Sequence, residues 1–274
     1  MQRLGPPHWP TYPPGAAYGA VLDRDPDAGL RAARLGGRLI ANDLAQLGID
    51  VDCAPVADVP AAGADPVIGD RAYCADPAKV AALASAFAAG LTEGGVLPVL
   101  KHLPGHGRAT ADSHQRLPVV TADRATLDAT DFAAFRPLCG LPLGMTAHVV
   151  FTAIDPVAPA TTSANIVKHV IRDSIGFTGL LMSDDISMGA LSGSLSERTR
   201  AAIAAGCDVV LHCNGSLSEM VEVAAEAPAL AGEAAHRAEA ALVARKPPAP
   251  LDVAASRTEL AKLLNDIRPE AGFA

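Results

Sequence analysis

The chain has 274 residues, half of them hydrophobic, which is enough to bury one sizeable core. Its formal net charge is −8 at pH 7 and no segment forms a basic stripe, so nucleic acid is excluded as an expected partner. No apolar run has the length of a signal-peptide core or a transmembrane helix, so we expect a cytoplasmic protein with no membrane partner.

Short apolar runs alternate along the chain with segments of helical periodicity. The five runs, rich in Val, Leu and Ile, are Ile49–Asp58, Leu97–Lys101, Leu143–His148, Leu180–Asp184 and Asp208–His212. Nearly continuous apolar runs are typical of parallel strands that are buried on both faces. The alternation therefore predicts a repeated βα unit.

Helix signals lie between these runs. They predict helices through Leu35–Leu47, from Asp76-Pro77 to before Gly94, after Ser163, and after Ser216, where Glu219 completes a capping box. The proline-rich residues 246–250 then separate the last of these helical segments from a short terminal helix near Ser256–Ile267. We therefore expect a main domain over 1–245, followed by a linker and helical tail over 246–274.

Each apolar run ends in side chains capable of chemistry. These are Asp58, Lys101 with His102, His148, Asp184 with Asp185, and His212. In a parallel barrel the carboxyl ends of the strands converge on one face, where catalytic residues lie. An open doubly wound sheet also binds ligands at that edge, but no glycine-rich phosphate loop accompanies any run. An α/β fold of the TIM-type (β/α)8 barrel is therefore predicted.

The densest group of titratable side chains lies on the loop after the second run. Lys101, His102, His106, Asp112 and His114 fall within fourteen residues. Loops at strand ends commonly form active sites. One alternative is a metal-dependent barrel hydrolase that uses His102, His106 and His114, since histidine and aspartate can bind zinc. Their position on a single loop argues against it, because barrel sites usually gather ligands from several strands.

Four motifs in order along the chain carry a family resemblance. They are Val-Ile-Gly-Asp-Arg (67–71), Lys-His-Leu-Pro-Gly-His-Gly (101–107), Asp-Ser-His (112–114) and Gly-Leu-Leu-Met-Ser-Asp-Asp-Ile-Ser-Met (179–188). Together they resemble glycoside hydrolase family 3, and most closely its bacterial cytoplasmic β-N-acetylhexosaminidases of peptidoglycan recycling. The resemblance implies a retaining enzyme that hydrolyses terminal β-linked GlcNAc from muropeptides. It implies an amino-sugar saccharide as the substrate, no cofactor and no metal.

The resemblance also assigns roles to six residues. Asp184 would be the nucleophile that forms a covalent glycosyl-enzyme. His114, oriented by Asp112, would be the general acid and base in place of the usual carboxylic acid. Substrate-binding roles fall to the polar side chains that would hydrogen-bond the sugar hydroxyls or the acetamido group: Arg71, Lys101 and His102.

The chain departs from the family at its beginning. Only five strands are predicted where the barrel has eight, and the family's Asp-x-Glu-Gly-Gly motif is absent. We therefore expect a barrel that is incomplete at the N-terminus, with the remaining strands encoded upstream of Met1. This departure keeps open a third function class, an inactive sugar-binding relic. Oligomeric state is not predicted.

Overall fold

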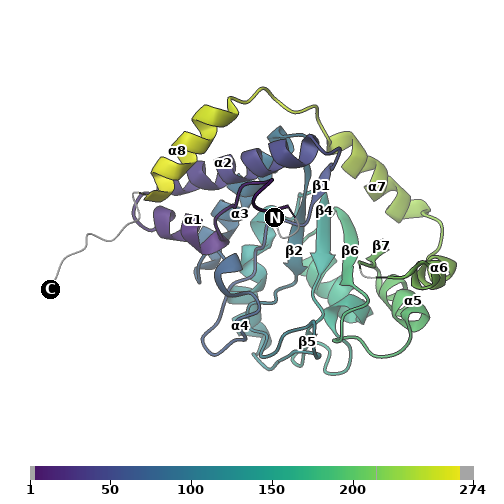
Figure 1. Cartoon of the computed structure of the whole chain (residues 1–274). Helices are drawn as coiled ribbons and strands as arrows, with labels where there is room; N and C mark the ends of the chain where they lie inside the picture. The colour runs from purple at the N-terminus through teal and green to yellow at the C-terminus, as the bar shows by residue number, and fades with distance from the viewer. Residues whose placement is uncertain (1–3, 214, 266–274) are drawn as a thin grey trace.

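The computed structural model describes residues 4–213 and 215–265 (Figure 1). The α-helices are α1 Gly15–Leu22, α2 Pro26–Ala45, α3 Pro77–Glu93, α4 Arg124–Ala129, α5 Leu195–Ala205, α6 Leu217–Glu226, α7 Gly232–Ala244 and α8 Val253–Asn265. The strands are β1 Val51–Asp52, β2 Leu97–Leu103, β3 Val119–Val120, β4 Leu143–Thr146, β5 Val150–Phe151, β6 Leu180–Asp185 and β7 Val209–Leu211. Short helical segments are η1 Gly69–Arg71, η2 Phe132–Ala134, η3 Arg136–Leu138, η4 Ala160–Thr162 and the π-helical η5 Ile166–Ser174.

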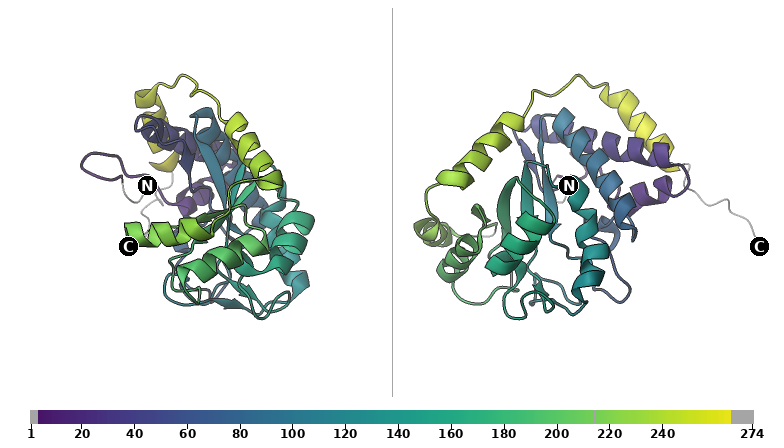
Figure 2. Two further views of the ribbon diagram at one scale, coloured as in Figure 1. Left: turned by 90° about the vertical axis from the view of Figure 1, so that its right-hand side faces the viewer. Right: turned by 180° about the vertical axis from the view of Figure 1, so that it is seen from behind.

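A curled parallel sheet of five strands forms the centre of the fold, in the order β1-β2-β4-β6-β7. The prediction of an α/β fold built on parallel strands is confirmed, and the strands follow one another in sequence as they do around a barrel. Helices α1, α2, α3 and α8 lie on the β1 side of the sheet, and α5 and α6 on the β7 side (Figures 1 and 2). The strands β3 and β5 pair in a separate two-stranded sheet.

The first predicted strand is much shorter than expected. Ile49–Asp58 is rich in apolar residues, but only Val51–Asp52 forms a strand; Val56 adds an isolated bridge to Lys101. Pro55 has no backbone N–H to donate, and the Ala54 N–H turns back to the Asp52 carbonyl, so the ladder is interrupted. Apolarity predicted the burial of Ala57, but Ile49 and Val51 are exposed and the break in pairing was not predicted.

The residues predicted to begin helices make the expected capping hydrogen bonds. The Asp76 carboxylate accepts from the Ala78 and Lys79 amides and begins α3, and the Ser216 and Glu219 capping box begins α6. Ser163 Oγ accepts from the Ile166 amide at 3.2 Å, although the helix it opens is π-type over Ile166–Ser174.

Helix α2 begins nine residues before the predicted Leu35, where Asp25-Pro26 repeats the signal that opens α3. Helix α8 begins at Val253, earlier than the predicted Ser256, and positions 266 and 267 of that predicted helix lie outside the described residues. The boundary at 245 and 246 stays a prediction. Leu260 of α8 belongs to the same apolar core as α2 and α3.

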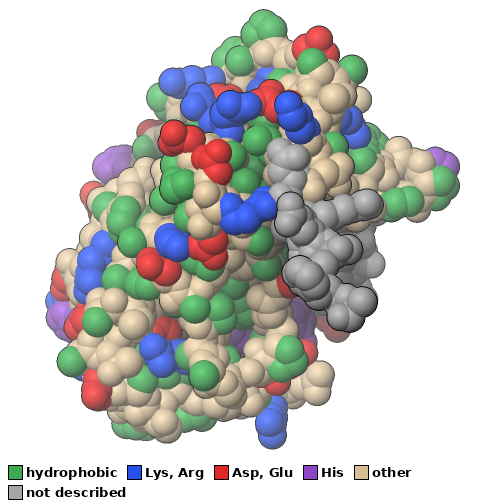
Figure 3. Space-filling view, turned by 90° about the vertical axis from the view of Figure 1, so that its left-hand side faces the viewer, with side chains coloured by type: hydrophobic (Ala, Val, Ile, Leu, Met, Phe, Trp, Pro, Cys, Tyr) green, Lys and Arg blue, Asp and Glu red, His purple; other side chains and the backbone are tan. Residues whose placement is uncertain are grey.

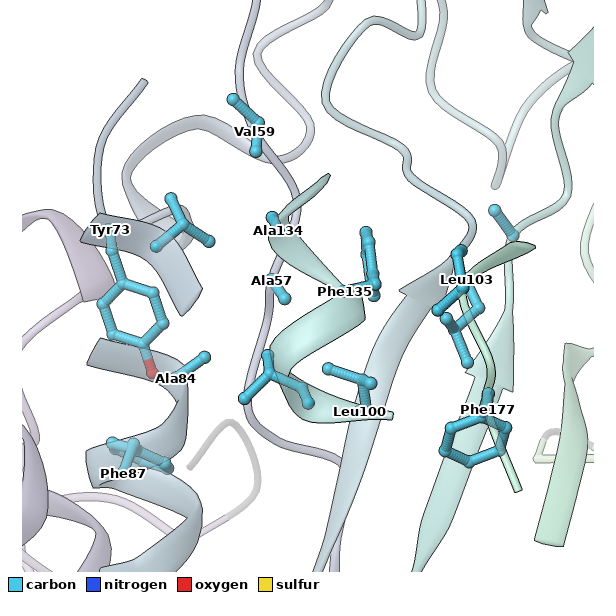
Figure 4. Packing of buried hydrophobic residues seen from close by; sticks show 14 of the residues in the cluster. Ala57, Val59, Tyr73, Ala84, Phe87, Leu100, Leu103, Ala134, Phe135 and Phe177 are labelled. Carbon is cyan, nitrogen blue, oxygen red and sulfur yellow. The ribbon is translucent and has the colours of Figure 1, made fainter. Parts of the chain in front are cut away.

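The main core lies between the helices and the outer face of the sheet. Figure 4 shows Tyr73, Ala84 and Phe87 on one side of this core and Leu100 and Phe177 on the other. Helices α2 and α3 pack closely because a β-carbon at Gly37 would lie 2.2 Å from the Phe87 carbonyl oxygen. The other face carries a second cluster, in which Ala241 of α7 packs on residues near the strand starts: Leu97, Val99, Leu143, Met145 and Leu180.

This second face positions the candidate site. Side chains two residues apart share a face of a strand, so Leu97 and Val99 lead to Lys101, and Leu180 and Met182 lead to Asp184. The apolar inner face therefore ends at its carboxyl edge in a lysine and a carboxylate. On the molecular face shown in Figure 3, acidic and basic side chains are interspersed. Within the described ranges, no helix is both long and apolar enough to cross a membrane.

Candidate active site

Asp184 presents a carboxylate at the end of β6 with little to hold it. Its Oδ1 accepts from the Asp185 amide at 2.8 Å, and no other residue of the described chain hydrogen-bonds this side chain. Burial alone would raise its pKa, but the neighbouring His102, the hydrogen bond from the Asp185 amide and Lys101 help to hold the pKa of Asp184 below its usual value. The carboxylate is therefore ionised near neutral pH, as nucleophilic attack requires.

Asp185 is held in place, unlike its neighbour. Its carboxylate accepts from the Ser187 amide at 3.0 Å, the Ser187 hydroxyl at 2.7 Å and the Cys213 amide at 3.2 Å. Only 6% of the residue is exposed. Asp185 thus fixes the turn after β6 and ties it to the end of β7, whereas Asp184 keeps one oxygen unbonded within the described chain.

His102 is oriented by a buried carboxylate. Its Nδ1 lies 2.6 Å from Asp58 Oδ2, which makes Nδ1 the donor and leaves Nε2 as the ring nitrogen available to a ligand. Asp58 Oδ1 also accepts from the His106 amide at 2.7 Å. Burial raises the pKa of Asp58, but His102 and His106 more than compensate, and the pKa lies below its usual value. The sequence placed Asp58 at a strand end; its pairing with His102, 44 residues away, was missed.

His148 is bonded to the backbone at the end of β6. Its Nε2 donates to the Asp185 carbonyl at 3.0 Å, and its Nδ1 lies 2.7 Å from the Thr161 hydroxyl. Since burial lowers the pKa of His148, the ring is neutral and accepts at Nδ1 from Thr161. The sequence assigned no role to this residue, and its fully satisfied ring is a packing feature that fixes the end of β6.

The predicted pair of Asp112 and His114 is brought together on the dyad loop, residues 108–116. His114 Nδ1 lies 2.8 Å from Asp112 Oδ1, which also accepts from the His114 amide at 2.9 Å. That amide, with the imidazole, lowers the pKa of Asp112. The His114 side chain is 65% exposed. Neither side chain hydrogen-bonds Asp184 in the described structure.

Two backbone hydrogen bonds place the dyad loop beside the segment that follows β6. The Ser113 carbonyl accepts from the Ala190 amide at 3.1 Å, and the His114 carbonyl accepts from the Gly189 amide at 3.2 Å. Gly189 and Ala190 follow Asp184 by a few residues, so the loop rests on the segment that leaves β6. The dyad is therefore a neighbour of the strand-end site without touching its carboxylate.

The three predicted substrate-binding residues separate into two places. Lys101 and His102 lie close enough to Asp184 to lower its pKa. Arg71 lies instead on η1, where its exposed guanidinium donates to the Val67 carbonyl at 3.3 Å. Val67 in turn lines a polar hollow on the dyad side of the site, with Asp65, Pro66, Asp112, Gln115 and Arg116. Arg71 therefore stands next to this hollow through Val67, without lining it itself.

The histidines of the predicted metal alternative do not converge. His102 is bound to Asp58, His106 to Ser113 and His114 to Asp112. Within residues 4–213 and 215–265 no three His, Cys, Asp or Glu side chains are grouped as metal ligands would be. The arrangement does not support a zinc site on this loop, since four-coordinate zinc needs its ligands within about 2 Å of one point.

The chain is similar in sequence and in structure to named proteins. A beta-hexosaminidase of Alkalilimnicola ehrlichii is 43% identical over 206 residues, which are 74% of this chain and 59% of that relative. A beta-hexosaminidase of Aromatoleum aromaticum is 38% identical over 218 residues, which are 78% of this chain and 61% of that relative. The chain thus spans about three fifths of the length of these curated relatives. The crystal structure of NagZ from Neisseria gonorrhoeae in complex with N-trifluoroacetyl-D-glucosamine superposes with a TM-score of 0.79 at 32% identity, covering 94% of this chain and 76% of that one.

The family model described as the glycosyl hydrolase family 3 N terminal domain matches residues 2–243. This range includes the strand-end carboxylate and the dyad loop. It ends two residues before the boundary predicted from the proline-rich segment. The chain therefore belongs to glycosyl hydrolase family 3.

Proposed function

We propose that this protein is a retaining β-N-acetylhexosaminidase that removes terminal β-linked GlcNAc from peptidoglycan-derived muropeptides. The observation that carries the proposal is the ionised Asp184 carboxylate at a strand end, facing Lys101 and His102, with an aspartate and histidine pair on the adjoining loop. The names of its curated and structural relatives, which span a longer chain, support the same activity.

The proposed reaction has two steps. In the first, Asp184 attacks the anomeric carbon, the bond from that carbon to the leaving oxygen breaks, and His114 donates its proton to that oxygen. In the second, His114 takes a proton from water, the water oxygen bonds the anomeric carbon, and Asp184 leaves as a carboxylate. Because the His114 side chain is exposed and does not hydrogen-bond Asp184 in the described structure, it must turn toward the bound sugar before the first step.

Polar side chains would orient the sugar. Lys101 and the free Nε2 of His102 lie at the strand ends beside Asp184, where they can hydrogen-bond hydroxyls of the sugar undergoing attack. Arg71, next to the dyad-side hollow, would act farther from the anomeric carbon. Aromatic residues form only 4% of the chain, so stacking is secondary to these contacts.

We also propose that the sheet is part of a TIM-type (β/α)8 barrel and that the protein acts in the cytoplasm on an amino-sugar substrate. Both edges of the sheet, β1 and β7, lack a neighbour within the described chain, and Val51 at the β1 edge is 37% exposed. Unpaired edges of this kind are normally closed or covered. If further strands of the family barrel are joined to the sheet, the free energy of unfolding should rise. An unchanged free energy of unfolding would argue against a closed barrel.

Turnover of a chromogenic GlcNAc β-glycoside tests the function directly. We expect release of the chromophore that is insensitive to EDTA, and mass spectrometry of the protein treated with a fluorinated slow substrate should locate the sugar on Asp184. Loss of activity with EDTA would favour the metal-dependent class. Absence of turnover together with measurable GlcNAc binding by calorimetry would instead identify an inactive sugar-binding relic.

A further inference from the structure

One buried hydrogen bond connects the strand-end site to the dyad loop, and the proposed mechanism does not use it. His106 Nε2 lies 3.0 Å from the hydroxyl oxygen of Ser113, which stands between Asp112 and His114. Both partners are only 3% exposed. The bond therefore joins the two parts of the site inside the protein, where water does not compete with it.

The His106 end of this bond is fixed. Its backbone amide donates to Asp58 at 2.7 Å, and its ring lies edge-on to the His102 ring with centroids 5.6 Å apart. The adjacent Gly107 packs directly on the Val59 carbonyl and leaves no space for a side chain, since a β-carbon there would lie 2.0 Å from that oxygen. His106 thus shares the rigid frame that orients His102.

The protonation of His106 determines the direction of the bond. Burial, and then the neighbouring His102, lower its pKa, so the ring is neutral and carries one N–H. Nδ1 is buried without a partner in the described structure. An unsatisfied buried N–H is rarer than an unsatisfied acceptor, so the proton is assigned to Nε2, which donates to Ser113 Oγ.

The start of the dyad loop is anchored, since Arg108 bonds Asp131 and Thr130 and the Ala109 carbonyl accepts from the Asp65 amide. The Ser113 end of the loop is held by fewer contacts. Its two neighbours bear the exposed dyad, and the backbone bonds to Gly189 and Ala190 hold only one side of it. We propose that His106 is a positioning residue that sets the place of the His114 general acid by latching Ser113. The inference rests on the proposed function for its catalytic consequence, but the latch itself is a structural statement.

A double-mutant cycle with two substrates tests the catalytic consequence. His106→Leu removes the donor at similar volume, Ser113→Ala removes the acceptor, and His106→Gln keeps a donor near the Nε2 position. We expect each of the first two to lower kcat/KM about tenfold for an alkyl glycoside, whose leaving group needs the acid, with less than a twofold change for a 2,4-dinitrophenyl glycoside. Because both changes break the same bond, kcat/KM of the double variant should be no lower than that of the less active single variant.

Hydrogen exchange tests the latch without activity. Peptides covering residues 108–117 should exchange faster in His106→Leu and Ser113→Ala than in the wild type, and His106→Gln should restore protection. Ser192→Ala, at an exposed serine, is the matched control and should change nothing. Equal losses on both substrates, multiplying losses in the double variant, or unchanged exchange would each overturn the proposal. A wild type that turns over neither substrate counts against the proposed function, and exchange then decides the latch.

Discussion

The two halves of the candidate site are held in opposite ways. At the strand ends, the buried Asp58 and His102 bond each other, and the buried Asp185 accepts hydrogen bonds from Ser187 and Cys213. On the dyad loop, Asp112 and His114 are bound mainly to one another, and the His114 side chain is 65% exposed. The difference fits the proposed roles: the groups around the sugar and the nucleophile form a fixed frame, whereas the proposed general acid must let substrate enter before it takes its place.

The strand-end half is tested most strongly at Asp184. Replacing it by alanine should lower turnover by about ten-thousand-fold or more while leaving the thermal midpoint nearly unchanged, because the carboxylate makes only one hydrogen bond within the described chain. Asp185→Asn should instead lower stability, since it disturbs the contacts with Ser187 and Cys213. Steady-state kinetics and thermal unfolding measure both. A stable, inactive Asp185→Asn beside an active Asp184→Ala would reverse the assignment.

The dyad half should respond in a way that depends on the leaving group. His114→Ala should slow an alkyl glycoside about a thousandfold and a 2,4-dinitrophenyl glycoside far less, because only the alkyl leaving group needs a proton. Asp112→Asn should give a weaker effect of the same kind. Neither change should lower stability measurably, since the pair is a surface contact. Equal losses on the two substrates would remove His114 from the acid role.

Local signals predicted much of the fold. The caps at Asp76 and at Ser216 each bond residues within four positions of themselves. Both partners of each bond can therefore be read from a short stretch of sequence. The start of α2 at Asp25-Pro26 carries the same signal, but it lies nine residues before Leu35, where the apolar pattern that predicts this helix begins.

The partners within the site could not be predicted in the same way. Asp58 bonds His102 across 44 residues, and this pairing depends on the register of β1 against β2, which no local pattern encodes. His148 and Thr161 meet through a connection that leaves β4 and returns. The strand-end rule identified which residues are near the site; only packing determines which of them bond each other.

Lys101 offers a milder test of the strand-end half. Lys101→Met should lower kcat/KM by about ten- to a hundredfold, the usual cost of losing a hydrogen bond to a charged group. Arg71→Met should cost less, because Arg71 lies next to the dyad-side hollow and not beside Asp184. Kinetics of both variants on one substrate make the comparison. A larger loss for Arg71 would move the sugar toward this hollow.

The smallest effect concerns stability and pH at the strand ends. Burial lowers the pKa of His106 and His148, so below about pH 6.5 the unfolded chain binds protons that the folded chain does not. The contribution of the two neutral rings to the free energy of unfolding is therefore complete above this pH. It decreases as the pH falls toward the pKa values of the folded state. We expect urea unfolding to show a loss between pH 7.5 and 5.5 that is at most about 1.4 kcal/mol for each of the two histidines.

A single substitution can assign part of that pH dependence. His148→Gln keeps a donor to the Asp185 carbonyl but cannot titrate, so it should remove about half of the loss. His236→Gln, at a ring whose side chain is 72% exposed, is the matched control and should leave the dependence unchanged. If His148→Gln and the wild type lose the same free energy between the two pH values, His148 is protonated in the folded protein. The buried strand end would then hold a charge as readily as the exposed dyad loop, and the contrast between the two halves would rest on geometry alone.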